Sequence, residues 1–457
     1  SVKAEELQKV PAANLMESLQ GKLPGVDITR SSGAAGAGIN VLVRGNRSLT
    51  ASNSPLFIVD GIQYNSIQDL NPQDIQSMEV LKDAASTAIY GARGANGVIL
   101  ITTKKGASGK TRVSFNSYAG VSELFGYPRV QDAEEYKQFR REANRTTGAW
   151  TGPQDDATIF GSLLNSPGAY WPDLMLRNGS QQDYQLGISA GTEKTNFYIS
   201  LNYFRENGLF LNDQLNRYSM RVNADHTISK MFKIGTQNQI TFYDQDIRRD
   251  PLNTAAKLVP LEVPYDADGN LQVWLNNNRT VSPLMDEQPG NWENNNRTSR
   301  IFNSAYVEFT PVKDLMFRSN LGVTITGGRD GLYAGSFTVE RNGAQPLARF
   351  NTRNLLGYNM ENILNYSKQL GRHGLTLTAV QSVLGNRREE VLAQGANQLL
   401  AYQSFYGLAN ANEQVSISST FEESRLLSYT GRLQYNFDDK YLLMLTARSD
   451  VGSRVEG

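Results

Sequence analysis

Residues 71–106 read NPQDIQSMEVLKDAASTAIYGARGANGVILITTKKG, and this stretch is the most informative part of the chain. Asn71-Pro72 predicts the start of a short helix, because the fixed φ of proline suits the first helical turn. Asp83 stands where an N-cap belongs, ahead of a helix-forming run. The residues at 98–103 are apolar and largely β-branched, which predicts a buried strand. The stretch therefore predicts a small α+β unit, and it contains no catalytic motif.

This order of features resembles the end of the plug domain of TonB-dependent outer-membrane transporters. Plug domains typically carry Gly-Pro where this chain has Asp83-Ala84, and the spelling EVLKDA at 79–84 resembles the SusC/RagA branch of the family. The resemblance continues upstream through LFIVDG at 56–61 and VRGN at 43–46. It implies a plug domain over residues 1–106, followed by a transmembrane β-barrel over 107–457.

The composition excludes several classes of protein. The chain has 45 basic and 45 acidic residues, so no charge excess points to nucleic acid as a partner. It contains no cysteine, which excludes disulfides, thiolate metal sites and cysteine nucleophiles within this sequence. No run approaches the roughly 18 consecutive apolar residues that a membrane helix needs.

From about residue 110 the sequence alternates between apolar and polar residues with a period of two. The clearest case is 217–225, where Tyr218, Met220, Val222 and Ala224 share one face, and Arg217, Ser219, Arg221, Asn223 and Asp225 share the other. Such alternation predicts strands with one polar and one apolar face. It recurs at 195–204, 232–242, 317–325 and 427–437.

Strand length and loop asymmetry distinguish a membrane barrel from a soluble β-protein. The predicted strands reach about ten residues, which a tilted strand needs to cross a bilayer, whereas globular strands average about five or six. Short turns, expected to be periplasmic, lie at 191–194, 228–231, 311–314, 368–373 and 438–439. Long connections, expected to be extracellular, span about 122–180, 205–216, 247–296, 328–350 and 389–423. This asymmetry is typical of outer-membrane barrels. A soluble or surface adhesive β-protein is the alternative.

The predicted fold is a membrane all-β, antiparallel barrel with a small α+β plug domain inside its lumen. We count about eleven strands, whereas single-chain bacterial barrels normally have an even number. The resemblance implies a plugged barrel of about 22 strands. We therefore expect this sequence to hold the plug and about half of the barrel. The TonB-contacting segment of the family, which lies before the plug, is also expected to lie outside it.

No cluster of residues predicts catalysis, a metal ion or a cofactor. The glycine-rich run at 33–38 lacks the helix and the Lys-Ser/Thr of a phosphate loop, so a flexible plug loop is the simpler interpretation. The run DADGN at 266–270 lacks the spacing of a calcium loop and predicts a hairpin turn instead. Loop carboxylates at 244, 246 and 250 suit either calcium or plain solvation. His226 and His373 are far apart in sequence and predict no zinc site or triad.

The resemblance places substrate contacts at three apices of the plug. These follow the first plug strand, the Arg-Gly strand and the Asp-Gly hairpin, and their amide, hydroxyl and guanidinium groups suit polar ligands. The candidate residues are Arg30, Ser31, Asn46, Arg47, Ser48, Gln63, Tyr64 and Asn65. Solvation is the alternative at each of them. Arg44 and Arg93 are expected instead to bind acidic residues of the barrel lumen.

Tryptophan supplies a second set of candidates. Trp150, Trp171, Trp274 and Trp292 all fall in two of the predicted extracellular loops. Exposed indole faces stack on sugar rings or peptide side chains, so Trp150, Trp274 and Trp292 are candidate substrate contacts. Packing within the loops and an aromatic belt at the membrane interface are the alternatives.

The function implied by the resemblance is TonB-energised import of oligomeric nutrients across the outer membrane of a Gram-negative cell, without enzyme activity. Glycans are the expected substrates, oligopeptides the alternative, and a siderophore or vitamin receptor a weaker one. The implied partners are a SusD-like lipoprotein lid, TonB with its inner-membrane motor, membrane lipid, and the oligosaccharide or oligopeptide. A dimer of transporter–lipoprotein pairs is a further implication of the same resemblance.

Overall fold

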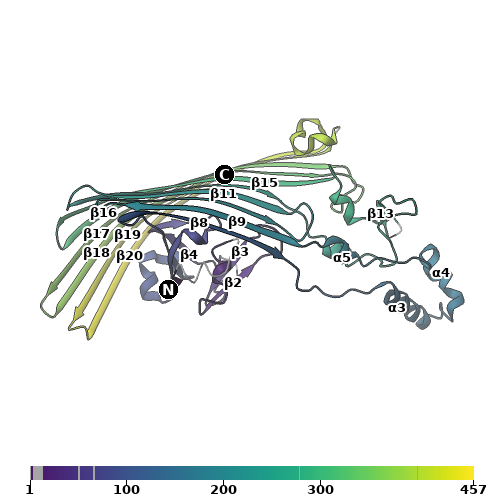
Figure 1. The fold of residues 1–457 in the computed structure, drawn as a ribbon, viewed down its shortest axis with the longest axis horizontal. Coiled ribbons are helices and arrows are strands. Elements are labelled where there is room, and N and C mark those ends of the chain that lie inside the picture. The colour runs from purple at the N-terminus through teal and green to yellow at the C-terminus, as the bar shows by residue number, and fades with distance from the viewer. Residues whose placement is uncertain are drawn as a thin grey trace.

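The computed structural model describes residues 2–3, 14–49, 52–64, 67–276, 278–398 and 400–456. A small five-stranded sheet and a large eleven-stranded sheet make up most of it. Figure 1 shows the small N-terminal domain, in purple, lying under the concave face of the curved large sheet. The N-terminal domain is called the plug below, and the large sheet is called the wall.

The plug consists of short elements. Its strands are β1 (Val2–Lys3), β2 (Val26–Arg30), β3 (Ile39–Val43), β4 (Leu56–Val59), β5 (Ile62–Tyr64), β6 (Ile75–Leu81) and β7 (Val98–Thr103). Its helical turns are η1 (Glu17–Leu19), η2 (Pro72–Asp74), α2 (Ala84–Thr87) and η3 (Ala88–Gly94). The five-stranded sheet has the order β1-β6-β7-β4-β5, and β2 pairs with β3 separately.

The stretch 71–106 folds largely as its residues predict. The Asn71 side chain accepts a hydrogen bond from the Gln73 backbone N–H, which caps η2. The Asp83 carboxylate accepts one from Ser86 N at 2.8 Å and caps α2. Strand β7 lies between β6 and β4, and its Val98, Ile99, Ile101 and Thr103 are buried. The predicted helix is shorter than expected: it tightens into the 3₁₀ turn η3, in which Gly91 adopts φ 63°.

The wall contains eleven strands, each antiparallel to its neighbour in chain order. They are β8 (Gly109–Ser122), β9 (Gly179–Gly191), β10 (Thr195–Asn207), β11 (Gln214–Thr227), β12 (Phe232–Asp246), β15 (Trp292–Val312), β16 (Leu315–Ala334), β17 (Leu347–Leu370), β18 (His373–Gln398), β19 (Ala411–Phe437) and β20 (Tyr441–Glu456). The predicted strand count is confirmed.

Burial on the wall is inverted relative to a water-soluble protein. In β11, Arg217 and Arg221 are only 1% exposed, whereas Tyr218 and Met220 are 50% and 41% exposed. The polar face therefore points toward the plug and the apolar face points outward. This arrangement is favourable only where the outer face contacts an apolar solvent.

The connections separate by length to opposite ends of the wall. The short turns lie together at one end, and the long connections lie at the other, at the right in Figure 1. The long connections carry α3 (Ala133–Thr146), η4 (Pro153–Asp155), α4 (Asp156–Phe160), η5 (Gly161–Leu163), α5 (Trp171–Met175), α6 (Leu252–Ala255), β13 (Trp274–Leu275), β14 (Thr280–Val281), η6 (Pro283–Glu287), η7 (Ala401–Tyr406) and η8 (Leu408–Asn410). Among the described residues, no helix is long and apolar enough to cross a membrane.

Three predicted connections are shorter than expected because their strands continue beyond the alternating pattern. Strand β10 ends at Asn207 and β11 begins at Gln214, within the predicted loop 205–216. Strand β18 extends to Gln398 and β19 begins at Ala411, so most of 389–423 is strand. Likewise β16 ends at Ala334 and β17 begins at Leu347, within the predicted loop 328–350. In these segments pairing with the neighbouring strand continues beyond the stretches in which the sequence alternates clearly.

Candidate functional site

A buried polar network joins the plug to one side of the wall. The carboxylate of Asp74, the last residue of η2, accepts hydrogen bonds from Tyr198 Oη at 2.9 Å and Gln185 Nε2 at 2.7 Å. Arg221 Nε lies 3.5 Å from the same carboxylate, and Gln185 Oε1 accepts a bond from Asn71 Nδ2 at 2.7 Å. A buried charge pair that lost one partner would leave the other uncompensated, so this contact strongly resists separation.

The same side carries three further contacts. The Asp69 carboxylate accepts from Arg300 Nη1 at 3.2 Å, and its backbone carbonyl accepts from Gln239 Nε2 at 2.6 Å. Asn223 Nδ2 donates to Thr103 Oγ1 at 2.9 Å. These side chains come from β11, β12 and β15, and those of the Asp74 network come from β9 to β11. We call this the anchored side of the plug: Asp69, Asn71, Asp74 and Thr103 with their partners on β9–β12 and β15.

The glycine-rich run at 33–38 is a loop, as predicted, and it is held by carboxylates of the wall. Ala35 N donates to Asp213 Oδ2 at 3.0 Å, and Gly36 N donates to Glu206 Oε2 at 2.8 Å. These amides are therefore already occupied by acidic groups, which is inconsistent with phosphate binding. Burial raises the pKa of Asp213, in the connection 208–213, to about 6.

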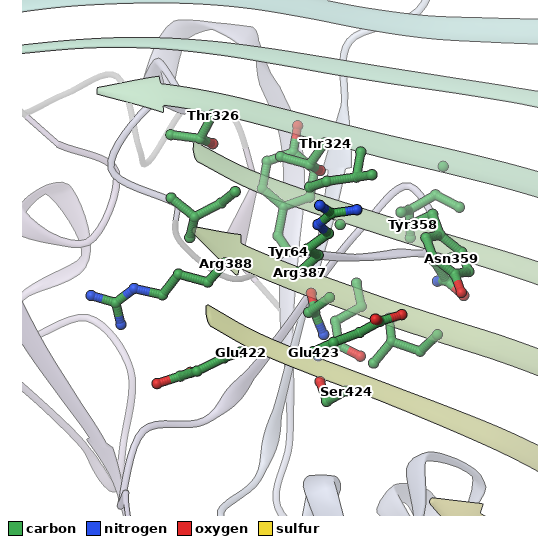
Figure 2. A pocket seen from close by; sticks show the side chains of 18 of the residues that line it. Tyr64, Thr324, Thr326, Tyr358, Asn359, Arg387, Arg388, Glu422, Glu423 and Ser424 are labelled. Atoms are coloured by element: carbon green, nitrogen blue, oxygen red, sulfur yellow. The ribbon is translucent and has the colours of Figure 1, made fainter. Parts of the chain in front are cut away.

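Three cavities lie between the plug and the inner face of the wall. The outer cavity, nearest the long connections, measures about 420 Å³, and its lining includes Arg30, Glu206, Arg217, Arg300 and Arg353. The middle cavity measures about 350 Å³, and its lining includes Tyr64, Thr324, Thr326, Asn359, Arg388 and Glu422. Figure 2 shows these middle-cavity side chains gathered between the plug and the strands of the wall.

The inner cavity lies closest to the short turns and measures about 520 Å³. Its lining includes Gln63, Arg93, Lys105, Glu361, Ser382 and Arg448. Arg448 Nη1 donates to the Ile89 backbone carbonyl at 2.6 Å, which links β20 to η3. All three cavities combine charges of both signs with hydroxyl and amide groups.

Three of the apex residues predicted from the sequence line these cavities. Arg30 lies in the outer cavity, where its guanidinium binds Glu206 at 2.7 Å and Glu17 at 3.3 Å. Burial opposes the Arg30 charge, but Glu206 and Glu17 outweigh it and raise its pKa. Tyr64 lines the middle cavity with its ring 4.5 Å from that of Phe302, and burial raises its pKa.

The remaining plug candidates lie elsewhere. Ser31 and Asn46 are exposed, Arg47 donates to the Ala95 carbonyl, and Ser48 N donates to Asn53 at 2.9 Å. Asn65 lies outside the described residues.

The two arginines expected to hold the plug differ in their surroundings. Arg93 donates to Gln63, and its pKa is lowered by burial and by the nearby charge of Arg448, which Asp450 and Glu361 offset only in part. Arg44 is exposed on the plug, with φ 61°.

The tryptophan side chains contact other residues of the long connections. Trp150 Nε1 donates to Asp156 at 2.9 Å, and Arg145 lies over its ring at 4.6 Å. Trp292 is buried at the start of β15, and Trp274 packs edge-on against Phe337. Trp171 is buried in a separate apolar cluster. None of the four lines a cavity described above, so direct stacking on substrate stays a prediction.

The wall residues of the middle cavity were not predicted individually. Thr324, Asn359, Arg388 and Glu422 all stand on the inward face of the wall, but only Thr324 falls in a stretch where alternation predicted a strand, and Glu422 falls in the predicted connection 389–423. Alternation also does not show how far along the barrel axis a residue lies relative to the plug, because that position depends on where the plug binds the wall.

Comparison with known proteins accounts for both parts of the structure. Residues 1–98 match the family TonB-dependent Receptor Plug Domain. The chain is 30% identical over 465 residues to the TonB-dependent receptor P26 of Formosa agariphila, covering 99% of this chain and 46% of that protein. It is 26% identical over 498 residues to the TonB-dependent receptor SusC of Bacteroides thetaiotaomicron, covering 99% of this chain and 47% of that protein.

A solved structure supports the same fold. The RagAB peptide importer in its open-open state superposes with a TM-score of 0.84 at 24% identity, over 99% of this chain and 54% of that one. The chain thus spans about half the length of the relatives it matches.

Proposed function

Because this chain is the plug domain and part of the outer-membrane barrel of a SusC-like TonB-dependent receptor, we propose that the protein imports an oligomeric nutrient across the outer membrane. The observation that carries the proposal is the outer and middle cavities, which lie between the plug and the wall and present charged, hydroxyl and amide groups beside apolar ones. A ligand entering from the long-connection end meets hydrogen-bonding groups of the wall together with Arg30, Gln63 and Tyr64 of the plug. The proposed role is transport, with no catalytic step.

Two substrate classes follow from different observations. The sequence favours glycans, on the strength of tryptophans that would stack on sugar rings. The geometry favours oligopeptides, because the tryptophans are engaged elsewhere and the cavities present Arg, Glu, Asn and Thr. Side chains of both charge signs match the termini and side chains of a peptide. The RagAB protein, which shares this fold, is a peptide importer, and that supports the second class.

The proposed mechanism has three steps. A SusD-like lipoprotein closes over the long connections and captures substrate with them. TonB then pulls on the segment that precedes the plug in this family, using the inner-membrane proton gradient. The plug rearranges and substrate reaches the periplasm. Exposed Leu124, Phe125 and Phe139 in the first long connection support a docking partner there, because exposed apolar groups mark interaction surfaces.

The test compares uptake of two labelled pools by cells expressing the full-length transporter. One pool is a tryptic digest of casein, and the other is a partial hydrolysate of mixed polysaccharides. We expect energy-dependent accumulation of one pool, abolished by a protonophore. Arg388→Ala should reduce uptake about tenfold at low substrate concentration, since hydrogen bonds to charged groups contribute about 1.5–3 kcal/mol.

The matched control is Arg372→Ala, which removes an exposed arginine at a short turn and should leave uptake unchanged. Accumulation of neither pool, or equal accumulation with and without the protonophore, would contradict the proposed function. Preference for the polysaccharide pool would contradict the peptide assignment and restore the glycan one.

A further inference from the structure

The side of the plug that faces β16–β18 differs from the anchored side. Here the plug presents the β4–β5 hairpin, whose Ile62 approaches the wall at Gly322. A Cβ at Gly322 would lie 2.8 Å from Ile62 Cγ2, so the hairpin seats directly against bare backbone. Tyr64 adds a ring contact with Phe302 of the adjoining strand β15. These contacts are apolar. Moving the hairpin away from the wall therefore breaks no buried ion pair like that of Asp74 and Arg221.

The three cavities form a file that begins at the outer cavity and continues along the β16–β18 side. The outer cavity is lined by Glu206, Arg217 and Asn296 from β10, β11 and β15 as well as by Thr326, Leu355 and Arg388 from β16–β18. The outer and middle cavities share Arg300, Thr326, Leu355 and Arg388. The middle and inner cavities share Gln63 of the hairpin. Along β16 the lining residues run in order from Thr326 through Gly322 to Arg318, from the long-connection end toward the short turns. The same progression holds on β17 and β18.

The barrier in this file is the tip of the hairpin. Ile62 and Gln63 stand between the middle and inner cavities, and Gln63 is held by a hydrogen bond from Arg93. Strand β5 has three residues, lies at the edge of the plug sheet and pairs with β4 alone. Displacing β5 therefore breaks strand pairing on one side only, and it withdraws the buried Ile62 and Tyr64 from the plug core.

We propose that substrate crosses between the plug and β16–β18, along this file of cavities, and that displacement of the β4–β5 hairpin from Gly322 opens the passage while the anchored side stays bound. The proposal rests on the import function proposed above. It names the route within the barrel and the segment that moves. Gly322 is a positioning residue, since its missing side chain lets Ile62 close the passage.

The first experiment uses disulfide staples, which the absence of cysteine from this sequence makes selective. Ile62→Cys with Gly322→Cys places two thiols within disulfide reach and locks the hairpin to the wall. Thr103→Cys with Asn223→Cys is the matched staple on the anchored side, where the native side-chain atoms lie 2.9 Å apart. Cross-linking in the full-length protein is scored by non-reducing electrophoresis of a plug cleaved from the barrel at an engineered protease site.

The hairpin staple should reduce energy-dependent uptake at least tenfold, and reductant should restore it. The anchored staple should leave uptake within twofold of the parent. Normal uptake through a fully formed hairpin staple would overturn the proposed route. Equal inhibition by both staples would show that the whole plug moves, and would overturn the claim that the anchored side stays bound.

A second experiment reads the opening directly through thiol accessibility. Ser382→Cys places a thiol in the inner cavity, and Ser200→Cys places one on the buried anchored side of β10. An impermeant cationic methanethiosulfonate is added outside cells supplied with both labelled pools. We expect modification at position 382 to be at least tenfold faster in energised cells than after protonophore, and modification at position 200 to be unchanged. Faster modification at position 200 alone would overturn the route.

Failure of this inference differs from failure of the proposed function. If the cysteine-free parent accumulates neither pool, the import function is wrong. If the parent accumulates a pool but the hairpin staple does not block it, the function stands and the route is wrong.

Discussion

The plug and the wall bury opposite kinds of side chain. The plug core is apolar, with Leu19, Ile75, Met78 and Ile99 essentially inaccessible, as in any protein folded in water. The wall buries polar side chains and exposes aliphatic and aromatic ones. The two regions belong to one chain with one composition, so the difference reflects their surroundings. The plug meets a polar inner surface, whereas the outer face of the wall meets lipid.

The largest expected effect concerns the polar junction between the two regions. Asp74→Ala should destabilise docking of the plug by about 3–5 kcal/mol, because it leaves Arg221 as an uncompensated buried charge. The measurement is a urea titration of the transporter in detergent, with a fluorophore on Asn46→Cys reporting the plug. Asp438→Ala removes an exposed partner of Arg372 and should cost at most about 1 kcal/mol. Equal costs would show that the junction is not a buried charge pair.

Truncation of an apolar residue should lower stability more in the plug core than on the outer face of the wall. Ile99→Ala should destabilise the plug by about 2–5 kcal/mol, since it leaves a cavity in a packed core. Leu321→Ala on the outward face of β16 should cost about 1 kcal/mol or less, because lipid chains fill the space. The same urea titration measures Ile99→Ala, and heat-modifiable migration measures Leu321→Ala. A large cost for Leu321→Ala would mean that protein, not lipid, covers this face.

A charge on the outer face should be costly only where lipid contacts it. Leu321→Arg should destabilise the barrel by about 2–4 kcal/mol, the cost of a cation near the bilayer midplane. Leu211→Arg, in the connection 208–213, is the matched change in water and should stay within about 0.5 kcal/mol. Folding into lipid vesicles at graded urea concentrations measures both variants. A neutral Leu321→Arg would favour a soluble β-protein over a barrel.

The smallest effect is a pH dependence where the two regions meet. Because the pKa of Asp213 is raised from 3.8 to about 6, the docked carboxyl holds a proton that the undocked one releases. Docking of the loop 33–38 should therefore be strongest below about pH 4 and weaken as pH rises through 6. A spin label at Gly33→Cys should become more mobile over that window. Asp213→Asn should remove the dependence, and an unchanged profile in that variant would assign the effect to another group.

The predictions from sequence were best where local chemistry decides structure. The caps at Asn71 and Asp83 and the buried strand at 98–103 formed as expected, because each depends on residues within a few positions. Prediction was weaker at 389–423, where pairing with a neighbouring strand, rather than alternation, sustains β18 and β19.

The candidate site shows the same division. Arg30, Gln63 and Tyr64 were predicted by motif, and all three line cavities. The wall residues that face them were not predicted, because they come from strands separated by hundreds of positions from the plug. The tryptophans were candidates by residue type, but contacts such as Trp150 with Asp156 depend on how the long connections fold.

The sequence by itself determined the two-part organisation, the strands and their polar and apolar faces, because the plug motif is contiguous and alternation acts through adjacent residues. Only the tertiary structure decided which strands of the wall bind the plug through buried polar contacts and which strands are separated from it by cavities. Buried pairs such as Asp74 with Arg221 form when segments far apart in the chain are brought together. Their energy depends on distance and burial in the folded molecule, and neither can be read along a single strand.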